Sequence, residues 1–263
     1  MKRIIGLLLK WVPRHVLHKW VHWSILRIAF IWKGNQFEDP ITGIAYRKML
    51  PYGRRSSRVN ALAPHTLSLE RHRLLWLFLK NETDFFNKPL RVLHLAPEYC
   101  FLKPFETAPN LSLVKADLNS PWADLHFDVH DIPFQSDSFD VILANHLLEH
   151  VDDDAKVLAE FHRVLKPGGW GIFQVPMDMK NPNTLEDPSI VTPEDRERHY
   201  WQADHVRLYG YEDYVNRLSK AGFQVDTINY AEQLGEQLTT RYCLGGERLV
   251  HLAMKPVEST GDM

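Results

Sequence analysis

The stretch FDVHDIPFQSDSFDVILANHLLEHV, residues 127–151, decides the fold class of this 263-residue chain. Within it, Phe139–Ala144 is a short apolar run of the kind that forms a strand buried on both faces. The following residues, Asp152–Leu165, carry three acids in their first turn and a base near the last, which suits a helix. Lys166–Gly169 then predicts the end of this helix, and Trp170–Val175 is the next predicted strand. A strand, a helix and a strand in this order indicate a parallel pair.

The same alternation continues on both sides of this stretch. Further strands are predicted at Leu90–Leu95, Leu111–Ala116, Phe223–Tyr230 and Arg248–Lys255, and further helices from Ser68 to about Leu79 and at Tyr211–Ala221. We therefore predict an α/β fold with a mostly parallel sheet. Ligands of such a sheet bind at the carboxyl ends of its strands.

Composition excludes several classes of protein. The chain is 44% hydrophobic and 24% charged, as expected for a globular protein with one large domain. Its two cysteines, Cys100 and Cys243, are too few for a disulfide scaffold or a cysteine-based zinc site, so we expect a reducing, cytoplasmic location. Its apolar runs stay below the roughly 18 residues that span a bilayer.

Charge divides the chain into a basic leader and an acidic body. Residues 1–36 hold seven Lys/Arg and no acid, which leaves 24 basic against 33 acidic residues in the rest. The acidic body argues against nucleic-acid binding. The leader has cationic side chains on one helical face and an apolar face rich in tryptophan, so residues 1–34 are predicted to contact an anionic membrane surface, on the inner face of the cell membrane. The alternative is that the tryptophan face packs on the folded domain.

Asp117 directly follows the second strand, roughly twenty residues after the loop of the first strand. An acid at this position can accept hydrogen bonds from both hydroxyls of a nucleoside ribose. It can equally be a turn former or a helix cap, so the position alone does not decide between the two.

Three motifs in order carry a family resemblance. The stretch 127–140, LEHV at 148–151 and RVLKPGG at 163–169 resemble the class I S-adenosylmethionine-dependent methyltransferases of the small-molecule branch. The resemblance covers roughly residues 90–255. It implies a Rossmann-like, mostly parallel seven-stranded sheet with helices on both faces and a final antiparallel strand, and S-adenosyl-L-methionine as cofactor.

The loop after the first strand departs from the family pattern. Where those enzymes usually have an acid and a glycine-rich D-x-G-x-G loop, this chain has LHLAPE at 93–98. The phrase resembles a bacterial subgroup that carries the loop in this form, as do residues 68–77 and 186–210. We therefore expect a compensated cofactor site, although a lost site is the alternative. The resemblance implies these cofactor-binding residues: His94, Ala96, Pro97, Glu98, Asp117, Asp128, Val129 and Asn145.

Each cofactor contact has an expected role. Glu98 would face the ammonium of the methionine end, and Asp117 would hold the ribose. Asp128 would bind the adenine amino group, with help from the backbone of Val129. Asn145 would lie near the transferred methyl.

On the acceptor side, His205 and His150 are the predicted catalytic residues, with His205 as general base. His146 and Arg207 are predicted to bind the substrate, Arg207 through an anionic group. For His150 and His205 a purely structural role is the alternative, because the chain holds fourteen histidines.

Residues 37–66 form an irregular module that is rich in turn formers. In some relatives this module bears two Cys-Pro-x-Cys knuckles and is similar to a zinc ribbon. Here Asp39–Thr42 and Ala63–Thr66 stand at those positions without any thiolate, so a metal-free module is predicted. The predicted domains are a leader at 1–36, this degenerate ribbon-like module at 37–66 and a methyltransferase domain at 67–258.

These features together predict a methyltransferase that acts on an oxygen or nitrogen of a small-molecule, glycan or lipid-linked acceptor. Two alternatives remain. A non-catalytic, membrane-associated scaffold of the same fold would explain the missing glycines and thiolates. A nicotinamide-dependent oxidoreductase would share the ribose acid, although the G-x-G-x-x-G fingerprint is absent.

Overall fold

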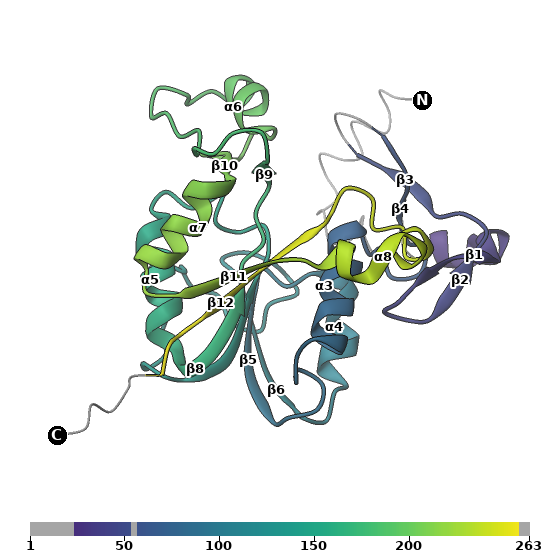
Figure 1. Cartoon of the computed structure of the whole chain (residues 1–263), viewed down its shortest axis with the longest axis horizontal. Coiled ribbons are helices and arrows are strands. Elements are labelled where there is room, and N and C mark those ends of the chain that lie inside the picture. The colour runs from purple at the N-terminus through teal and green to yellow at the C-terminus, as the bar shows by residue number, and fades with distance from the viewer. Residues whose placement is uncertain (1–23, 54–56, 258–263) are drawn as a thin grey trace. The chain divides into compact units, whose positions relative to one another are not determined.

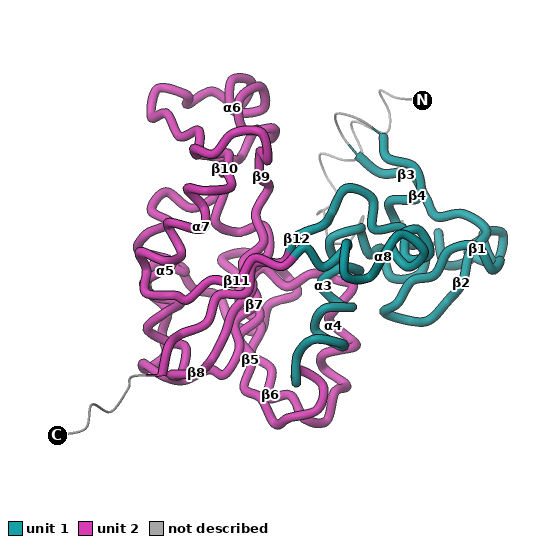
Figure 2. Tube along the Cα trace, viewed as in Figure 1, with its two compact units in different colours: residues 1–84, 229–249 teal, residues 85–228, 250–263 magenta. Residues whose placement is uncertain are grey.

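The computed structural model describes residues 24–53 and 57–257 (Figure 1). The chain divides into two compact units, residues 1–84 with 229–249 and residues 85–228 with 250–263 (Figure 2). This division differs from the predicted domains of 1–36, 37–66 and 67–258, since residues 67–84 and 229–249 group with the N-terminal strands. The prediction for the leader falls largely on residues 1–23, outside the described ranges.

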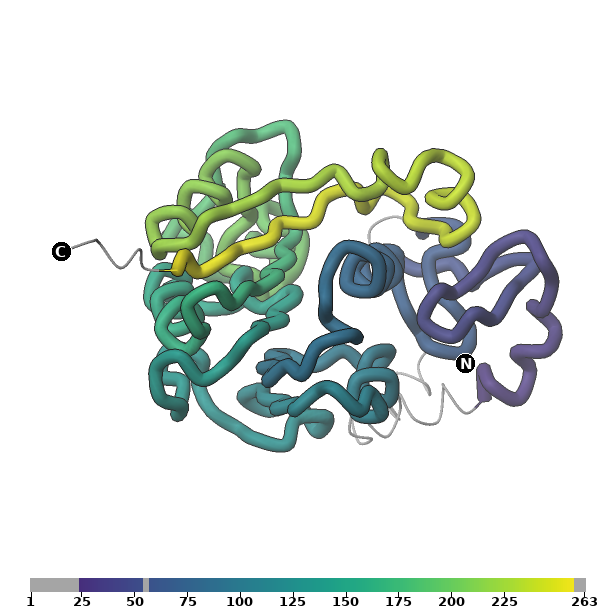
Figure 3. Tube along the Cα trace, turned by 60° about the horizontal axis from the view of Figure 1, so that its bottom comes forward, coloured from purple at the N-terminus to yellow at the C-terminus, as the bar shows by residue number. Residues whose placement is uncertain are grey.

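The larger unit is built on a sheet in which six strands are described, in the order β11-β12-β8-β7-β5-β6. Their bounds are Leu90–Leu95 (β5), Leu111–Ala116 (β6), Phe139–Ala144 (β7), Leu165–Ile172 (β8), Gln224–Asn229 (β11) and Leu249–Met254 (β12). Strands β6, β5, β7 and β8 are parallel to one another, and β12 is antiparallel to β8. Figure 3 shows β11 and β12 side by side. The mostly parallel, Rossmann-like architecture with a late antiparallel strand is therefore confirmed.

The prediction of seven strands is wrong. Beside β6 the described chain makes a single parallel bridge, from Leu125 to Ala116, and no further strand. The segment turns away within a few residues, because Asp128 accepts a hydrogen bond from the amide of His130 through its side chain and from the amide of Asp131 through its carbonyl. Turn formation of this kind competes with a strand ladder.

Helices cover the two faces of the sheet. Four helices have these bounds: Tyr99–Glu106 (α4), Asp154–Val164 (α5), Pro193–Tyr200 (α6) and Tyr211–Lys220 (α7). Leu93 and Leu95 of β5 belong to the core that α5 and α7 share. His94, between them in sequence, lies instead against the rings of Phe101 and Phe105 on α4. Successive side chains of a strand point to opposite faces, so this alternation places α4 and the α5–α7 pair on opposite sides of the sheet.

Strand β8 begins five residues earlier than predicted. Lys166–Gly169 was expected to be a helix stop, but these residues lie within the strand. Gly168 adopts a φ of +78°, and its amide donates to the carbonyl of Lys255, while the amide of Lys255 donates to the carbonyl of Gly169. The hydrogen bonds with the end of the chain keep these residues in the sheet despite the glycines. Two short strands, β9 (Met177–Asp178) and β10 (Tyr209–Gly210), form a separate parallel pair.

In its described residues, the smaller unit has two antiparallel strand pairs, two helices of twelve residues each and a short helical stretch at 24–28. Strands β1 (Lys33–Asp39) and β2 (Ile44–Tyr46) pair antiparallel, as do β3 (Leu50–Tyr52) and β4 (Arg58–Leu62), and the 3-10 helix η1 (Ala29–Trp32) precedes them. The helices are α3 (Glu70–Asn81) and α8 (Tyr230–Arg241), of which α8 was not predicted. Arg73 of α3 is fully buried and donates to the carbonyls of Ala61, Ser68, Tyr242 and Cys243. These bonds join residues distant in sequence and explain why α3 and the segment after α8 belong to one unit.

Among the residues that the structure describes, none of the helices combines the length and the apolar character that crossing a membrane requires.

Candidate functional site

The sheet order locates the place where a ligand would bind. Strand β5 pairs with β6 on one side and with β7 on the other, so the strand order reverses between β5 and β7. In open α/β sheets, ligands bind outside the carboxyl ends of the strands at such a switch point. The residues that follow β5, β6 and β7 are those around Ala96, Asp117 and Asn145.

The first polar cluster at this edge joins β5, the loop after it and the end of β7. Glu98 accepts a hydrogen bond from Nδ2 of Asn145 at 2.8 Å, and its other oxygen lies 2.7 Å from Nε2 of His94. His94 and Asn145 are both buried. Within the described chain, Nδ1 of His94 and Oδ1 of Asn145 are buried without a hydrogen-bond partner. Because buried polar atoms normally have partners, we expect a ligand to complete this cluster.

Ala96 has the backbone conformation that the loop after β5 requires. Its φ is +47°, in the left-handed region that favours glycine, and its amide donates to the carbonyl of Ala116 at 3.0 Å. Pro97, the next residue, is buried. The loop therefore keeps a glycine-like turn although it has lost its glycines, at the cost of backbone strain of the kind that collects at ligand sites.

The predicted nucleoside contacts follow β6. Oδ1 of Asp117 accepts hydrogen bonds from the amides of Asn119 and Ser120, at 2.7 and 2.6 Å, so this carboxylate does form a turn. Asp128 is exposed, and its Oδ1 accepts from the amide and Nδ1 of His130. These bonds, led by the one from the amide, lower the pKa of Asp128. Val129 is buried in the core shared with α5 and α7.

A second polar cluster joins the loop after β7 to the segment between α6 and β10. Glu149, His150 and His205 offer ligand atoms that all lie within 4.8 Å of one another. The rings of His150 and His205 are 4.8 Å apart between centroids and nearly perpendicular, at 86°. Glu149 and His205 are each 1% exposed, whereas His150 is exposed. The two predicted catalytic histidines, 55 residues apart in sequence, are thus brought together by the fold.

The hydrogen bonds of this cluster leave lone pairs available. The carbonyl of Tyr200 lies 2.9 Å from Nδ1 of His205 and can only accept, so that nitrogen carries the proton and Nε2 carries a lone pair. Among the described residues, Nε2 of His205 and Oε2 of Glu149 are buried without a partner. The other oxygen of Glu149 lies 3.0 Å from Nδ1 of His146. His146 itself has a φ of +52°.

Burial and charge set the protonation of the cluster. Burial lowers the pKa of His205 and so favours its neutral ring. For Glu149, burial acts to raise the pKa, but the hydrogen bond from His146 and the charges of His146 and His150 outweigh it and the pKa is lowered. The carboxylate therefore stays ionised beside a neutral imidazole.

Arg207 holds this loop in place and does not face an acceptor. It is 1% exposed, and its guanidinium donates to the carbonyls of Leu148, Val151 and Asp152 and to Oε1 of Glu186. The amide of Val206 also donates to the carbonyl of Glu149, at 2.9 Å. The prediction that Arg207 binds an anionic acceptor conflicts with this geometry, because its donors are directed at the protein's own backbone.

Glu149 was missed by the sequence prediction. The motif LEHV led to a predicted catalytic role for its neighbour His150 and to none for the acid. The available signal was the combination of an acid, a histidine and two apolar residues directly after a buried strand. That signal does not reveal which of the polar residues points inward.

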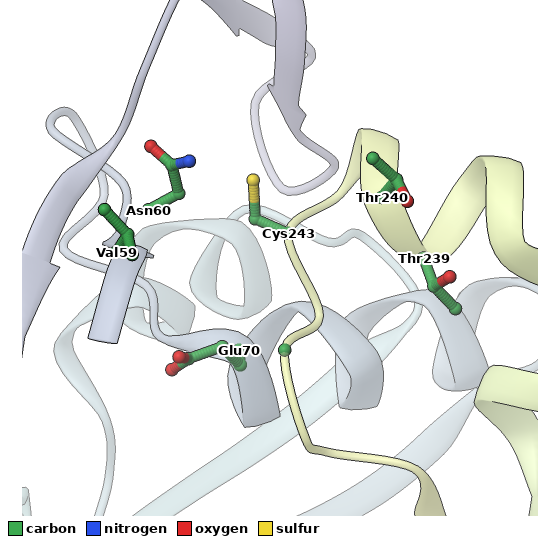
Figure 4. Close-up of a pocket in the computed structure, with 7 residues that line it drawn as sticks. Val59, Asn60, Glu70, Thr239, Thr240 and Cys243 are labelled. Carbon is green, nitrogen blue, oxygen red and sulfur yellow. The ribbon is translucent and has the colours of Figure 1, made fainter. Parts of the chain in front are cut away.

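The smaller unit has a pocket of its own, of about 280 Å³ (Figure 4). It is lined by Val59, Asn60, Glu70, Thr239, Thr240, Cys243 and Gly245, and none of the predicted site residues belongs to it. Burial raises the pKa of the Cys243 thiol to about 11, so the thiol stays protonated and is a poor nucleophile. Glu70 is paired with Arg58 at 2.8 Å. This pocket therefore offers fewer side chains that can react or bind a ligand than the sheet edge does.

The comparisons with known proteins find methyltransferases similar to parts of this chain. Residues 105–173 match the model of the family described as Methyltransferase domain. The chain is 48% identical over 42 residues to the ubiquinone/menaquinone biosynthesis C-methyltransferase UbiE of Desulfotalea psychrophila, covering 16% of this chain and 17% of that protein. It is 43% identical over 51 residues to demethylmenaquinone methyltransferase of Chlorobaculum parvum, covering 19% and 21%.

The alignment thus spans about a fifth of the length of these curated relatives. Among solved structures, a similar one is the 1,6-didemethyltoxoflavin-N1-methyltransferase of Burkholderia thailandensis with bound S-adenosylhomocysteine. It is 17% identical, with a TM-score of 0.47, and the match covers 71% of this chain and 78% of that one. The match to the methyltransferase domain family falls on the segment that holds β6, β7, Asn145 and Glu149.

Proposed function

We propose that this protein transfers a methyl group from S-adenosyl-L-methionine to an oxygen or nitrogen of a small-molecule, glycan or lipid-linked acceptor. The observation that carries the proposal is the incomplete cluster of His94, Glu98 and Asn145 at the switch point of the sheet. The methyltransferase-domain match over residues 105–173 includes one of these residues and supports the same chemistry.

The residues after β5 fit the methionine end of the cofactor. Glu98 is an acid next to Asn145, whose Oδ1 lacks a partner among the described residues, so the two offer acceptors to an ammonium group. The positive φ of Ala96 turns the backbone as a glycine would, which permits close approach of a ligand. His94, buried behind Glu98, orients the carboxylate.

The residues after β6 fit the nucleoside end. Asp117 is fixed by the two amides that its Oδ1 accepts, so its second oxygen is held at the end of the strand for the ribose hydroxyls. In this proposal Asp128 accepts from the adenine amino group and the backbone of Val129 lies beside the ring. The lowered pKa of Asp128 keeps it ionised for that purpose.

When bound, the cofactor supplies a methyl already activated on a sulfonium. The residues of the chain then have to align the acceptor and take up its proton. His205 presents an unprotonated Nε2 that has no hydrogen-bond partner among the described residues, and Glu149 fixes the ring of His146. The exposed His150, whose ring lies against that of His205, belongs to the same polar cluster.

Calorimetric titration with S-adenosylhomocysteine tests the proposal. We expect one site per chain in the wild type and binding weakened by about 1–3 kcal/mol in Asp117→Ala, because charge-assisted hydrogen bonds to the ribose are lost. Asp124→Ala, an exposed acid of the same loop that pairs with Lys115, is the matched control and should bind normally. Unchanged affinity in Asp117→Ala would remove Asp117 from the site. Absence of binding by the wild type would favour the non-catalytic scaffold.

We also propose that the basic leader brings the protein to an anionic membrane surface. In the described part of the leader, four large apolar side chains are exposed: Leu26, Ile28, Phe30 and Ile31. Such side chains suit an interfacial segment whose neighbours are cationic. Sedimentation with anionic vesicles at low and high salt tests this, since binding that depends on Lys/Arg weakens as salt rises.

A further inference from the structure

We propose that Glu149, His150 and His205 form a binding site for one divalent transition-metal ion. The three side chains offer two imidazole nitrogens and one carboxylate oxygen within 4.8 Å of one another. This inference concerns metal binding and can be tested without methyl transfer, but it gives the Nε2 lone pair of His205 to the metal instead of to the proton of the acceptor.

The lone pairs needed for coordination are present on the right atoms. In His205 the proton is on Nδ1, which bonds to the carbonyl of Tyr200, so the lone pair of the buried Nε2 is available. In His150, Nδ1 lies 3.2 Å from the carbonyl of Asp204, which likewise leaves the lone pair on Nε2. A second-shell carbonyl that accepts from the other ring nitrogen is the usual partner of a metal-bound histidine.

Two of the three residues carry a buried atom that has no hydrogen-bond partner in the described chain and can serve as a ligand. Nε2 of His205 and Oε2 of Glu149 are both buried and unbonded, on side chains only 1% exposed. A protein interior rarely keeps an ionised carboxylate oxygen and a nitrogen lone pair side by side without a donor or a cation between them. A cation at this point would satisfy both atoms at once.

The loop is held in the arrangement that coordination requires. Arg207 binds the carbonyls of Leu148, Val151 and Asp152, on either side of Glu149 and His150. Ligand atoms of a four-coordinate zinc with bonds of about 2.0–2.1 Å lie about 3.4 Å apart, so ligand atoms that lie within 4.8 Å of one another would have to approach by up to about 1.4 Å. His150 is the exposed member of the three.

The donor set indicates the class of metal. Two imidazoles with one carboxylate suit Zn²⁺, Fe²⁺, Co²⁺ or Mn²⁺ and not the oxygen-preferring Mg²⁺ or Ca²⁺. Three protein ligands leave at least one position open, as in catalytic metal sites. If the proposed function holds, the hydroxyl or amine of the acceptor would take the open position and the ion would polarise it. With the metal bound, this would replace the general-base role of His205, because its Nε2 lone pair would then be held by the ion.

Cobalt titration of the metal-free, tag-free full chain tests the site. We expect one Co²⁺ per chain, with visible absorption typical of nitrogen and oxygen ligands, and competition by Zn²⁺. Affinity should fall at least 100-fold in Glu149→Gln and in His205→Ala. His199→Ala and Glu197→Gln, exposed residues of α6, are the matched controls and should bind Co²⁺ like the wild type.

His150→Ala keeps the test decisive if the variants at the buried residues fail to fold. His150 is exposed, so its removal should leave the core packed. It too should lose at least tenfold in affinity while the circular dichroism spectrum stays unchanged. The proposal is overturned if the wild type binds no Co²⁺ up to about 1 mM, or if His150→Ala and His205→Ala bind it normally. Binding of S-adenosylhomocysteine, measured separately, reports on the proposed function.

Discussion

Asp39 and Glu149 are both buried acids, one in each unit, and their surroundings differ in an instructive way. The carboxylate of Asp39 accepts from the hydroxyl of Thr66 at 2.5 Å, from the amide of Ile41 at 3.2 Å and from the hydroxyl of Ser68 at 3.4 Å. Both of its oxygens are therefore bonded. Glu149 has one oxygen bonded to His146 and the other without a partner in the described chain.

The two acids also have opposite pKa shifts. Burial raises the pKa of Asp39 in spite of its hydrogen bonds, because hydroxyls and one amide do not repay the lost hydration of a charge. Histidines next to Glu149 do repay it and lower the pKa of that carboxyl. We call Asp39 with Ile41, Thr66 and Ser68 the closed network, which stabilises two turns. The open cluster is Glu149 with its histidines, and it is available to a ligand.

The largest effect is expected from the residue that supports the open cluster. Arg207→Ala should lower the free energy of unfolding by about 3–5 kcal/mol, since it leaves three loop carbonyls without their donor and Glu186 with Arg217 as its remaining partner. Arg198→Ala, which removes an exposed ion pair with Asp195, should cost no more than about 1 kcal/mol. Denaturant unfolding of both variants measures this. A loss below about 1 kcal/mol for Arg207→Ala would show that the loop does not depend on it.

A smaller effect is expected in the closed network. Asp39→Ala should cost about 2–3 kcal/mol in unfolding free energy, because Thr66 and Ser68 lose their buried acceptor. The exposed Asp226→Ala is the control and should stay within about 0.5 kcal/mol of the wild type. Equal stability of the two variants would mean that the Asp39 network contributes nothing to the module.

The smallest effect is expected in how the titration of Asp39 makes the free energy of unfolding depend on pH. Since the folded pKa is raised above 3.8, the folded state binds the proton more tightly. The stability that this gives is complete below pH 3.8 and is lost as the pH rises through the raised value. Relative to Asp39→Asn, which cannot titrate, the wild type should therefore become less stable from about pH 4 to pH 8. Parallel stability curves for the two proteins over this range would contradict the raised pKa.

Most of the fold could be predicted from the sequence because buried parallel strands have a local signature. β5, β6 and β7 begin and end where their apolar runs predict. The seven-strand number came from the family resemblance and not from a local pattern, and the described chain turns at Asp128 after a single bridge beside β6. The start of β8 was missed because its pairing with residues near the chain end overrides Gly168 and Gly169. Such tertiary pairing has no local signal.

The candidate site was predictable only in part, for the same reason. His150 and His205 were selected singly, and their meeting depends on how Arg207 holds the loop. The sequence places polar residues near a strand end. The tertiary fold decides that Glu149 is buried and that Arg207 donates to the protein's own backbone instead of facing a ligand. Both of these depend on contacts between residues more than fifty positions apart.

Hydrogen–deuterium exchange with and without S-adenosylhomocysteine tests the central claim, that the open sheet edge binds a ligand and the closed network does not. We predict slower exchange on ligand addition in peptides that cover residues 94–101, 117–131 and 145–150, and unchanged exchange in those that cover 37–44 and 61–68. Protection confined to the smaller unit, or absent from the edge of the sheet at saturating ligand, would contradict the account.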